Sequence, residues 1–370
     1  MNPAALSPRA AWAARLNAVS FLDSAKAWTL LETLGPDGLS AGVAADWAAS
    51  GSLQPEPAAR WRAEALAFDL EGELRRVESL GARLILRGEP GYPAPLAAVP
   101  DAPLVLYAWG RLDELPAAAV VGARAPTVYG RRMARRLAAG FARRRVAVVS
   151  GLARGIDSEA HAAALDAGGA TWAVLGSGLG QVYPPENRDL ARRIAEEGGC
   201  VLSEFPLSLP PHRGNFPRRN RIVAGLSWAT IVVEGRSRSG SLLTAGDAAR
   251  YGREVFAVPG PADSPLSDGP HRLLRTGARL ATGAEDVTSL LPARFGACPA
   301  AADAGGPVPS LDAQEAQILR HLGGDSLSLE ELARLTALDM ERLSLIMFGL
   351  EIKELVSAIP GQRYAKKTLS

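Results

Sequence analysis

Between residues 118 and 260 the sequence repeats one pattern, and this pattern limits the possible fold more than any other feature. A short apolar run ends in glycine or serine, and stretches with helical spacing separate successive runs. The runs occupy 118–122, 146–151, 171–178, 200–205, 228–235 and 254–260. Continuous apolar runs predict strands buried on both faces, as in parallel sheets. Their alternation with helices predicts an α/β fold with a doubly wound sheet.

The segments on either side of this pattern differ from it in composition and period. Residues 1–82 place apolar residues at helical spacing, interrupted by LGPDGLSAG and QPEP, and predict a small helical module. One of its helices is expected over 57–80. The runs RLILR and PLVLYAWG then begin the sheet domain, 83–291. Residues 292–310 are rich in Pro, Gly and Ala without periodicity, which predicts a flexible linker.

The last segment, 311–370, returns to helical spacing. Its expected helices are 311–322, 328–337 and 339–351. Two short extended pieces follow, joined by the turn dipeptide Pro360-Gly361. Three helices and a hairpin predict a winged-helix-like module, in which the second and third helices form the helix–turn–helix pair.

The surface expected for this helix pair is more acidic than basic. The acidic residues are Glu330, Glu331, Asp339 and Glu341, and the opposing basic residues are Arg334 and Arg342. Acidic side chains on a reading helix repel DNA phosphates. A protein-contact or spacer role is therefore an alternative to DNA binding for this module.

Charge and cysteine usage limit the class of protein. The formal net charge of +2 excludes a uniformly basic surface, but it allows a local basic site because the field depends on charge distribution. Cys200 and Cys298 lack metal-ligand spacing and fit a reducing compartment. The first fifteen residues lack signal-peptide features, and no apolar run approaches the ~20 residues of a membrane span. We expect a cytoplasmic protein without membrane contact.

The glycine-marked strand ends are the first place to look for a ligand site, because doubly wound sheets bind ligands beyond the carboxyl ends of their strands. Two of these turns combine small residues with arginine, and they contain Gly122, Arg124, Ser150, Gly151, Arg154 and Gly155. Backbone N–H groups at a helix start and an arginine fork favour an anion. No turn matches a dinucleotide or triphosphate fingerprint, so no cofactor is expected.

A dense basic cluster follows in FPRRNR, which contains Arg218, Arg219, Asn220 and Arg221. A helix is expected over 219–226, and positive charge at a helix start opposes the helix dipole. The cluster therefore indicates a nearby anion. Pairing with carboxylates is the alternative, and the candidates are Glu186, Glu204 and Glu234.

The next strand end opens into a small polar loop. Ser239, Gly240 and Ser241 begin a helix expected over 241–250, where hydroxyl and N–H groups can hold phosphate. Phe216 and Tyr183 lie near these loops in the sequence and could stack on bases, or belong to the core. Together the loops predict a positively lined pocket that suits a phosphodiester chain.

The sequence offers little for catalysis. No histidine lies in a nucleophile-elbow context, and His161 falls inside an expected amphipathic helix where a packed side chain is the simpler interpretation. Glu234 is the best candidate for an acid or base, although an ion-pair orienter is the alternative. No Cys/His metal cluster is present. We therefore expect no catalytic residue and no metal.

Seven stretches together resemble the DNA-processing protein A (DprA/Smf) family. They are YPAPLAAVPDAPLVLYAWGRL, VVGARAPTVYG, SGLARGIDSEAHAAAL, GLGQVYPPENRDL, SEFPLSLPPHRGNFPRRNRIVAGLS, VVEGRSRSGSLLTA and VFAVPG, which occur in the family's order between residues 92 and 291. GAR, Ser150-Gly151, RRNR and SGS match the family motifs that form its DNA pocket. Residues 1–82 lack a clear form of the family's sterile-alpha-motif-like signature, although such a module remains the expectation there.

This resemblance implies an extended Rossmann-like domain that binds single-stranded DNA. It also implies protection of incoming strands during natural transformation, or competence, and a homodimer formed through that domain. In DNA recombination, members load RecA recombinase onto strands covered by single-strand-binding protein. The expected function is thus a non-enzymatic recombination mediator.

Two alternatives stay open beside this expectation. One is a nucleotide or phosphoribosyl hydrolase on a similar sheet, which would need a glycine-dense phosphate loop paired with a catalytic acid. The other is a transcription regulator that acts through the winged-helix-like module.

Overall fold

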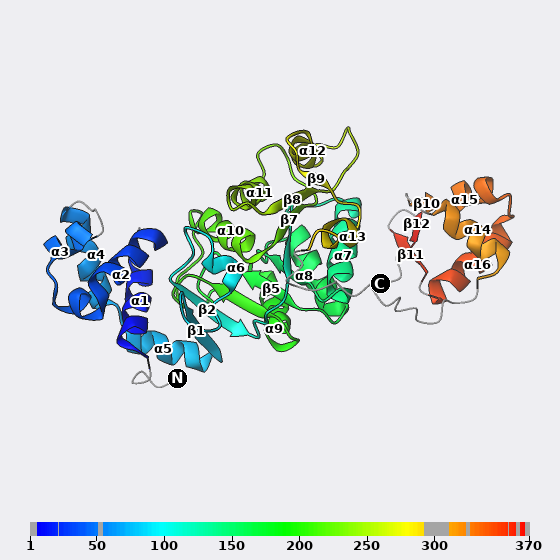
Figure 1. The fold of residues 1–370 in the computed structure, drawn as a ribbon. Helices are drawn as coiled ribbons and strands as arrows, with labels where there is room; N and C mark the ends of the chain where they lie inside the picture. Colours follow the sequence, from blue (N-terminus) through cyan, green and yellow to red (C-terminus); the bar gives the residue numbers. More distant parts are fainter. Residues whose placement is uncertain are drawn as a thin grey trace. The chain divides into compact units, whose positions relative to one another are not determined.

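The computed structural model describes the chain as two compact units, Met1–Ala301 and Ala302–Ser370 (Figure 1). The described residues are 6–20, 22–50, 55–291, 311–322, 326–353, 355–359 and 363–366. The expected linker over 292–310 and the turn dipeptide Pro360-Gly361 lie outside them.

The first unit is built around a nine-stranded, mostly parallel sheet. Its strands are β1 (Ala82–Leu86), β2 (Val105–Gly110), β3 (Ala117–Val121), β4 (Ala147–Ser150), β5 (Thr171–Val174), β6 (Cys200–Ser203), β7 (Ala229–Val232), β8 (Glu254–Ala257) and β9 (Arg279–Leu280). The spatial order is β1-β2-β6-β5-β4-β3-β7-β8-β9. The strands from β6 to β9 in this order are parallel, whereas β2 is antiparallel to both β1 and β6.

Helices cover both faces of this sheet (Figure 1). They are α6 (Ala94–Ala97), α7 (Val128–Arg143), α8 (Ile156–Asp166), α9 (Arg188–Glu196), α10 (Asn215–Leu226), α11 (Gly240–Arg250), α12 (Asp268–Arg275) and α13 (Ala284–Thr288), with the short 3-10 helix η2 (Pro185–Asn187). One apolar cluster joins the sheet to α7, α8 and α13, and another joins it to α6, α10 and α11. Every residue of β3 to β7 is buried, as the continuous apolar runs predicted. The doubly wound α/β fold is confirmed.

The strand order reverses between β3 and β7. The chain runs outward from β3 through β4 and β5 to β6, and then returns to place β7 on the other side of β3. The loops that leave the carboxyl ends of β3 and β7 consequently diverge to opposite faces of the sheet. A crevice opens at such a switch point, and it is where doubly wound sheets bind ligands.

Five helices precede the sheet, namely α1 (Pro8–Ala18), α2 (Ser24–Ala41), α3 (Ala44–Ser50), α4 (Pro55–Ala67) and α5 (Leu70–Ser79). Helix α2 is kinked at Gly35, whose φ is 62°, so the predicted break in this stretch is a kink. The single helix expected over 57–80 is wrong. Asp69 interrupts it by accepting the N–H of Gly72 at 2.9 Å, which caps the start of α5.

The second unit is a winged-helix fold. Its elements are α14 (Ala313–His321), β10 (Leu327–Ser328), α15 (Leu329–Thr336), α16 (Met340–Ile352), β11 (Val356–Ile359) and β12 (Arg363–Lys366). Capping boxes at Asp312 and Ser328 fix the starts of α14 and α15. The predicted helices and hairpin are confirmed. The two-residue strand β10, which pairs with β12, was not predicted.

Candidate nucleic-acid interface

A cavity of about 690 Å³ lies at the carboxyl edge of the sheet, where the strand order reverses. Its walls come from the loops after β3, β4 and β7, from the segment around Tyr183, and from one face of α10. The lining residues are Val121, Gly122, Arg124, Gly151, Ala153, Asp157, Tyr183, Arg213, Phe216, Pro217, Arg219, Asn220, Val223, Ser239, Gly240, Ser241, Leu243 and Thr244. Residues predicted from separate motifs thus lie around one space.

Arg219 lies at the floor of this cavity and is almost fully buried. Its guanidinium donates to the carbonyl oxygens of Gly151 and Val174, which follow β4 and end β5. Burial is the main cause that lowers the pKa of Arg219 to about 10; the charge of Asp157 opposes this shift, and the charge of Arg124 adds to it. Arg219 is still a cation at neutral pH, so it fixes positive charge beneath the cavity while it ties α10 to two strand ends.

The loop after β4 is held by the buried carboxylate of Asp157. This carboxylate accepts the backbone N–H groups of Gly151 at 3.0 Å and Ala153 at 3.3 Å. Burial raises the pKa of Asp157, although the charge of Arg219 and these hydrogen bonds oppose the shift. The hydroxyl of Ser150 donates to the carbonyl of Val120 at 2.7 Å inside the protein. Ser150 therefore contributes to the loop's shape, and its hydroxyl is occupied.

Aromatic rings and exposed arginines surround the mouth of the cavity. The rings of Tyr183 and Phe216 lie 5.8 Å apart, and the Arg124 guanidinium lies 5.8 Å from the Phe216 ring centre. Tyr183 is 38% exposed, so its ring is open to a ligand. Among the described residues, no carboxylate pairs with Arg124 or Arg213. These two side chains are exposed cations whose charge is available to a ligand.

The loop before α11 closes the side of the cavity. The Ser239 hydroxyl accepts the N–H of Ser241 at 3.3 Å and lies 2.8 Å from its hydroxyl. Between them, Gly240 has open space where a side chain would start, with no neighbouring atom within 4 Å. Bare backbone at a helix N-terminus allows close approach of an anion.

The other predicted glycines serve packing. A Cβ on Gly122 would lie 2.7 Å from Ile156, and one on Gly155 would lie 2.4 Å from the Ala123 carbonyl oxygen. Gly155 also has a φ of 80°, in the left-handed region that favours glycine. These two glycines let the loops after β3 and β4 approach each other closely.

The structure divides the predicted basic cluster between two faces of α10. This helix begins at Asn215 instead of 219, because Pro217 lies in the first turn, where its missing N–H is tolerated. Arg218 and Arg221 line a separate cavity of about 470 Å³ and pair with Glu204. The structure thus brings Arg219 and Asn220 to the main cavity, whereas carboxylate pairing accounts for the other two arginines.

Arg154 lies at the edge of the site. It forms a surface ion pair with Glu186 and lines a shallow hollow beside Tyr183. Arg213 is a basic lining residue that was not among those predicted from the sequence. It lies in HRGNF, immediately before α10, so the same motif that identified the basic cluster contained the signal.

The two residues considered for acid–base chemistry are structural. The buried carboxylate of Glu234 accepts the N–H of Thr127 at 2.9 Å and its hydroxyl at the start of α7. The alternative of an ion pair with arginine was wrong, since no described arginine pairs with Glu234. His161 is fully buried with Nδ1 2.7 Å from the Thr171 hydroxyl, as the packing interpretation predicted.

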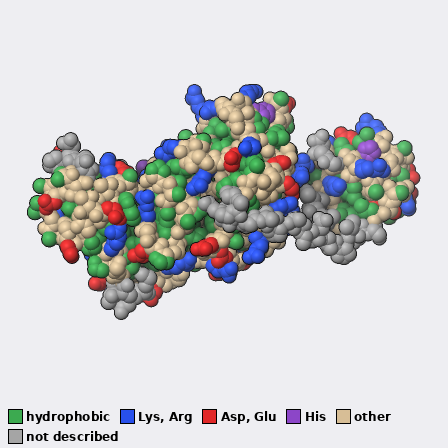
Figure 2. Space-filling view, viewed as in Figure 1, with side chains coloured by type: hydrophobic (Ala, Val, Ile, Leu, Met, Phe, Trp, Pro, Cys, Tyr) green, Lys and Arg blue, Asp and Glu red, His purple; other side chains and the backbone are tan. Residues whose placement is uncertain are grey.

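Charge elsewhere on the first unit is mixed. Figure 2 shows acidic and basic side chains interspersed on the face drawn, with basic side chains on the projection formed by α11 and α12. Within the described ranges, no group of three or more His, Cys, Asp or Glu could hold a metal ion. No helix in the described part of the chain is long and apolar enough to cross a bilayer.

The sequence matches two family models. The model described as DNA recombination-mediator protein A matches residues 83–292, and the DprA winged helix domain matches residues 299–362. Protein Smf of Escherichia coli is 39% identical over 299 residues, covering 79% of each chain. The DNA processing protein DprA of Bacillus subtilis is 43% identical over 206 residues, covering 55% of this chain and 69% of its own.

Solved structures give the same likeness. The X-ray structure of DNA processing protein A from Streptococcus pneumoniae has a TM-score of 0.65 and 33% identity, covering 77% of this chain and 98% of that one. A second structure, of DNA processing protein A from Helicobacter pylori, has a TM-score of 0.51 and 28% identity, covering 56% and 93%. Its description concerns the single-stranded DNA binding mode of that protein.

Proposed function

Because the chain belongs to the DNA recombination-mediator protein A family, we propose that its carboxyl-edge cavity binds single-stranded DNA without regard to base sequence. The observation that carries this proposal is one cavity lined by the exposed cations Arg124 and Arg213, the buried cation Arg219 and the Tyr183–Phe216 ring pair. Guanidinium groups attract phosphates, and exposed rings stack on any base.

The geometry supports binding to an unpaired strand in preference to a duplex. Bases of a single strand are free to turn toward Tyr183 and Phe216, whereas the bases of a duplex are stacked on one another. The bare backbone at Gly240 allows a phosphate to approach the N-terminus of α11. Contacts to phosphate carry no base code, so sequence-neutral binding follows.

The wider role extends this binding activity. We propose a non-enzymatic mediator that acts in the cytoplasm as a homodimer through its Rossmann-like domain. It would protect incoming strands in natural transformation and load RecA recombinase onto DNA covered by single-strand-binding protein. Family membership supports this role, and a sequence-neutral site suits it because incoming strands have arbitrary sequence.

The proposal is tested by replacing Arg124 with alanine. The Arg124→Ala variant should bind oligo(dT) more weakly by ~1–3 kcal/mol, with a salt slope smaller by about one, because one phosphate contact is lost. Fluorescence anisotropy on several base sequences should give the same loss. Arg192→Ala is the matched control, because Arg192 is an exposed arginine on α9 outside the cavity. Equal affinities for the Arg124 variant and the wild type would remove this arginine from the site.

A second assay separates binding from catalysis. Incubation of the full chain with nucleoside monophosphates should release no free base. Glu234 and His161 are bonded outside the cavity, and the Asp157 carboxylate that lines it is engaged by the N–H groups of Gly151 and Ala153. Release of base at a rate that depends on Glu234 would favour the hydrolase alternative.

A further inference from the structure

Helix α10 presents different residues on two opposite faces. Residues 216, 219, 220 and 223 line the main cavity, whereas 218 and 221 line the separate cavity on the other side. At about 100° per residue, these two sets point in nearly opposite directions from the helix axis. The contacts that hold the second face therefore determine how the first face is oriented toward a DNA strand in the cavity.

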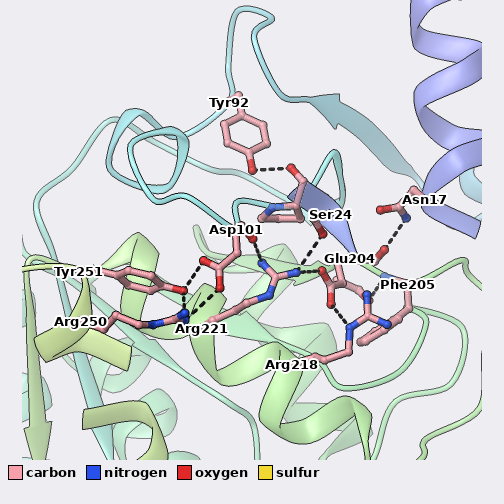
Figure 3. Close-up of polar contacts among 12 residues, drawn as sticks. Asn17, Ser24, Tyr92, Asp101, Glu204, Phe205, Arg218, Arg221, Arg250 and Tyr251 are labelled. Carbon is pink, nitrogen blue, oxygen red and sulfur yellow. Dashed lines mark hydrogen bonds and ion pairs between the residues drawn. The ribbon is translucent and has the colours of Figure 1, made fainter. Parts of the chain in front are cut away.

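The second face is held by the carboxylate of Glu204, which is only 2% exposed (Figure 3). This carboxylate accepts a hydrogen bond from Arg221 and lies 3.5 Å from Nε of Arg218. Arg221 also donates to the main-chain carbonyl of Asp101. The Arg218 guanidinium lies 5.4 Å from the Phe205 ring centre. A buried carboxylate with two arginine partners fixes a position strongly, because its separation from these arginines would leave a buried charge without compensation.

The N-terminal helices reach the same cluster from the other side. The amide of Asn17, near the end of α1, donates to the main-chain carbonyl of Glu204 at 2.6 Å. The hydroxyl of Ser24, at the start of α2, accepts a hydrogen bond from Arg221 at 3.2 Å. Figure 3 shows both residues converging on the Glu204–Arg221 pair. The N-terminal module is thus bonded to the residue pair that holds α10.

The cluster continues toward α11. The carboxylate of Asp101 accepts hydrogen bonds from Tyr251 and, at 2.9 Å, from Arg250. Burial acts to raise the pKa of Asp101, but the Tyr251 hydrogen bond and the charges of Arg221 and Arg250 outweigh it and lower the pKa. The carboxylate is therefore ionised at neutral pH. Asp101 therefore links the second face of α10, through its main-chain carbonyl, to the end of α11, through its carboxylate. The other end of α11 closes the cavity.

We propose that the N-terminal helical module sets the affinity of the cavity for single-stranded DNA by holding α10 through Glu204, with Asn17 and Ser24 as the latch. This inference rests on the proposed function of the cavity. Asn17 and Ser24 do not line the main cavity, so they are positioning residues. They act through Arg221 and Glu204 on the orientation of Phe216, Arg219 and Asn220.

The test is a double variant, Asn17→Ala with Ser24→Ala, in the full chain. Its affinity for oligo(dT) should fall about fivefold, because couplings through packed networks reach this size. Thr29→Ala is the matched control, since the Thr29 hydroxyl bonds only to its own helix α2 and is exposed. An affinity equal to that of the wild type would overturn the proposal.

A double-mutant cycle separates positioning from general loss of stability. The latch variant combined with Asn220→Ala should lose less than the sum of the two effects, because both act through α10. The control variant Thr29→Ala combined with Asn220→Ala should be additive, since the Thr29 hydroxyl bonds within its own helix α2 and does not contact the latch. Additivity in both cycles would show that the latch does not act through α10.

Amide hydrogen exchange without DNA keeps this inference distinct from the proposed function. In the latch variant, exchange should accelerate in α10 and stay unchanged in α7. If the wild type binds no oligo(dT), the proposed function fails while exchange still reports on the latch. Unchanged exchange in α10 would overturn the latch even if the wild type binds DNA.

Discussion

At the scale of single residues, the site depends on how closely Gly151 approaches Arg219. A Cβ built on Gly151 would lie 2.5 Å from the central carbon of the Arg219 guanidinium. Gly176 likewise allows the close approach of Phe216, because a Cβ built on Gly176 would lie 2.7 Å from the Phe216 ring. The absence of side chains at these two positions lets a cation and a ring of α10 settle against the strand ends.

Replacement of Gly151 by alanine should therefore disturb both folding and binding. The added methyl group must displace the buried Arg219 from its carbonyl acceptors, which overpacks the site at a cost of ~1–3 kcal/mol in the free energy of unfolding. Urea denaturation measures this loss, and oligo(dT) affinity should fall with it.

Gly240→Ala is the matched comparison, since it adds the same methyl group to another glycine of the cavity. Open space at this position predicts stability unchanged or raised by ~0.4–1 kcal/mol. Its DNA affinity should still fall, because the methyl group blocks the approach of a phosphate to the backbone. A Gly151→Ala protein as stable as Gly240→Ala would contradict the packing argument.

The buried His161 predicts a pH dependence of stability. Burial, aided by the charge of Arg219, lowers its pKa from 6.5 to about 3. The unfolded chain therefore binds a proton below pH 6.5 that the folded chain rejects. The contribution of His161 to the free energy of unfolding is fully present above pH 6.5. As the pH falls toward 3, this contribution decreases by up to ~1.4 kcal/mol per pH unit.

The measurement for His161 is urea unfolding as a function of pH, compared with the His161→Asn variant. Asparagine keeps a partner for the Thr171 hydroxyl but does not titrate. The difference in unfolding free energy between the two proteins should shrink as the pH falls below 6.5. A constant difference between pH 7 and pH 4 would show that His161 does not titrate as its burial requires.

At the scale of elements, the start of α7 depends on a residue that follows β7. Glu234 accepts both donors of Thr127, the N-cap of α7, and its carboxylate fills the space beside Gly130. A carboxylate at a helix N-terminus is stabilised by the helix dipole. This contact joins the two diverging loops of the switch point, one of which carries Arg124.

Glu234→Gln should therefore destabilise the protein without changing its shape. The amide N–H₂ group of glutamine would face a donor of Thr127, so that donor would lose its acceptor. A buried donor without an acceptor lowers the free energy of unfolding by ~1–3 kcal/mol. Thermal or urea unfolding measures the loss, with Glu285→Gln as a control for an exposed carboxylate on α13. Equal losses in the two variants would remove Glu234 from the support of α7.

The sequence predicted elements well where a local pattern is sufficient. Apolar runs that end in small residues predicted the strands β3 to β8. The parallel topology then predicted that the loops after these strands lie at one edge of the sheet. The division of Arg218, Arg219 and Arg221 could not be predicted, because it depends on which face of α10 meets Glu204 and which meets the strand ends. The start of α10 was misplaced because Pro217 is tolerated in the first turn of a helix, so the helix begins before it at Asn215.

At the scale of the whole molecule, the two units differ in the surfaces that they offer to DNA. The first unit gathers cations at one cavity. In the winged-helix unit, the outer face of α16 presents Leu345 and Phe348, each 63% exposed, beside the exposed Glu341. In a helix–turn–helix protein this is the face that enters the major groove, where arginine and polar side chains contact phosphates and bases. Arg342, next to Glu341, is exposed as well, but a mainly apolar face suits a protein contact better than a duplex.

This difference predicts that duplex affinity is independent of the α16 face. The double variant Leu345→Ser with Phe348→Ser should bind blunt duplex DNA and oligo(dT) as the wild type does, because neither side chain can contact a phosphate. Leu335→Ser is the control, because Leu335 is a half-exposed leucine at the end of α15 in the same unit. Anisotropy titrations of the full chain measure both affinities. A selective loss of duplex binding in the double variant would instead make α16 a reading helix that recognises DNA by apolar contact with thymine methyl groups.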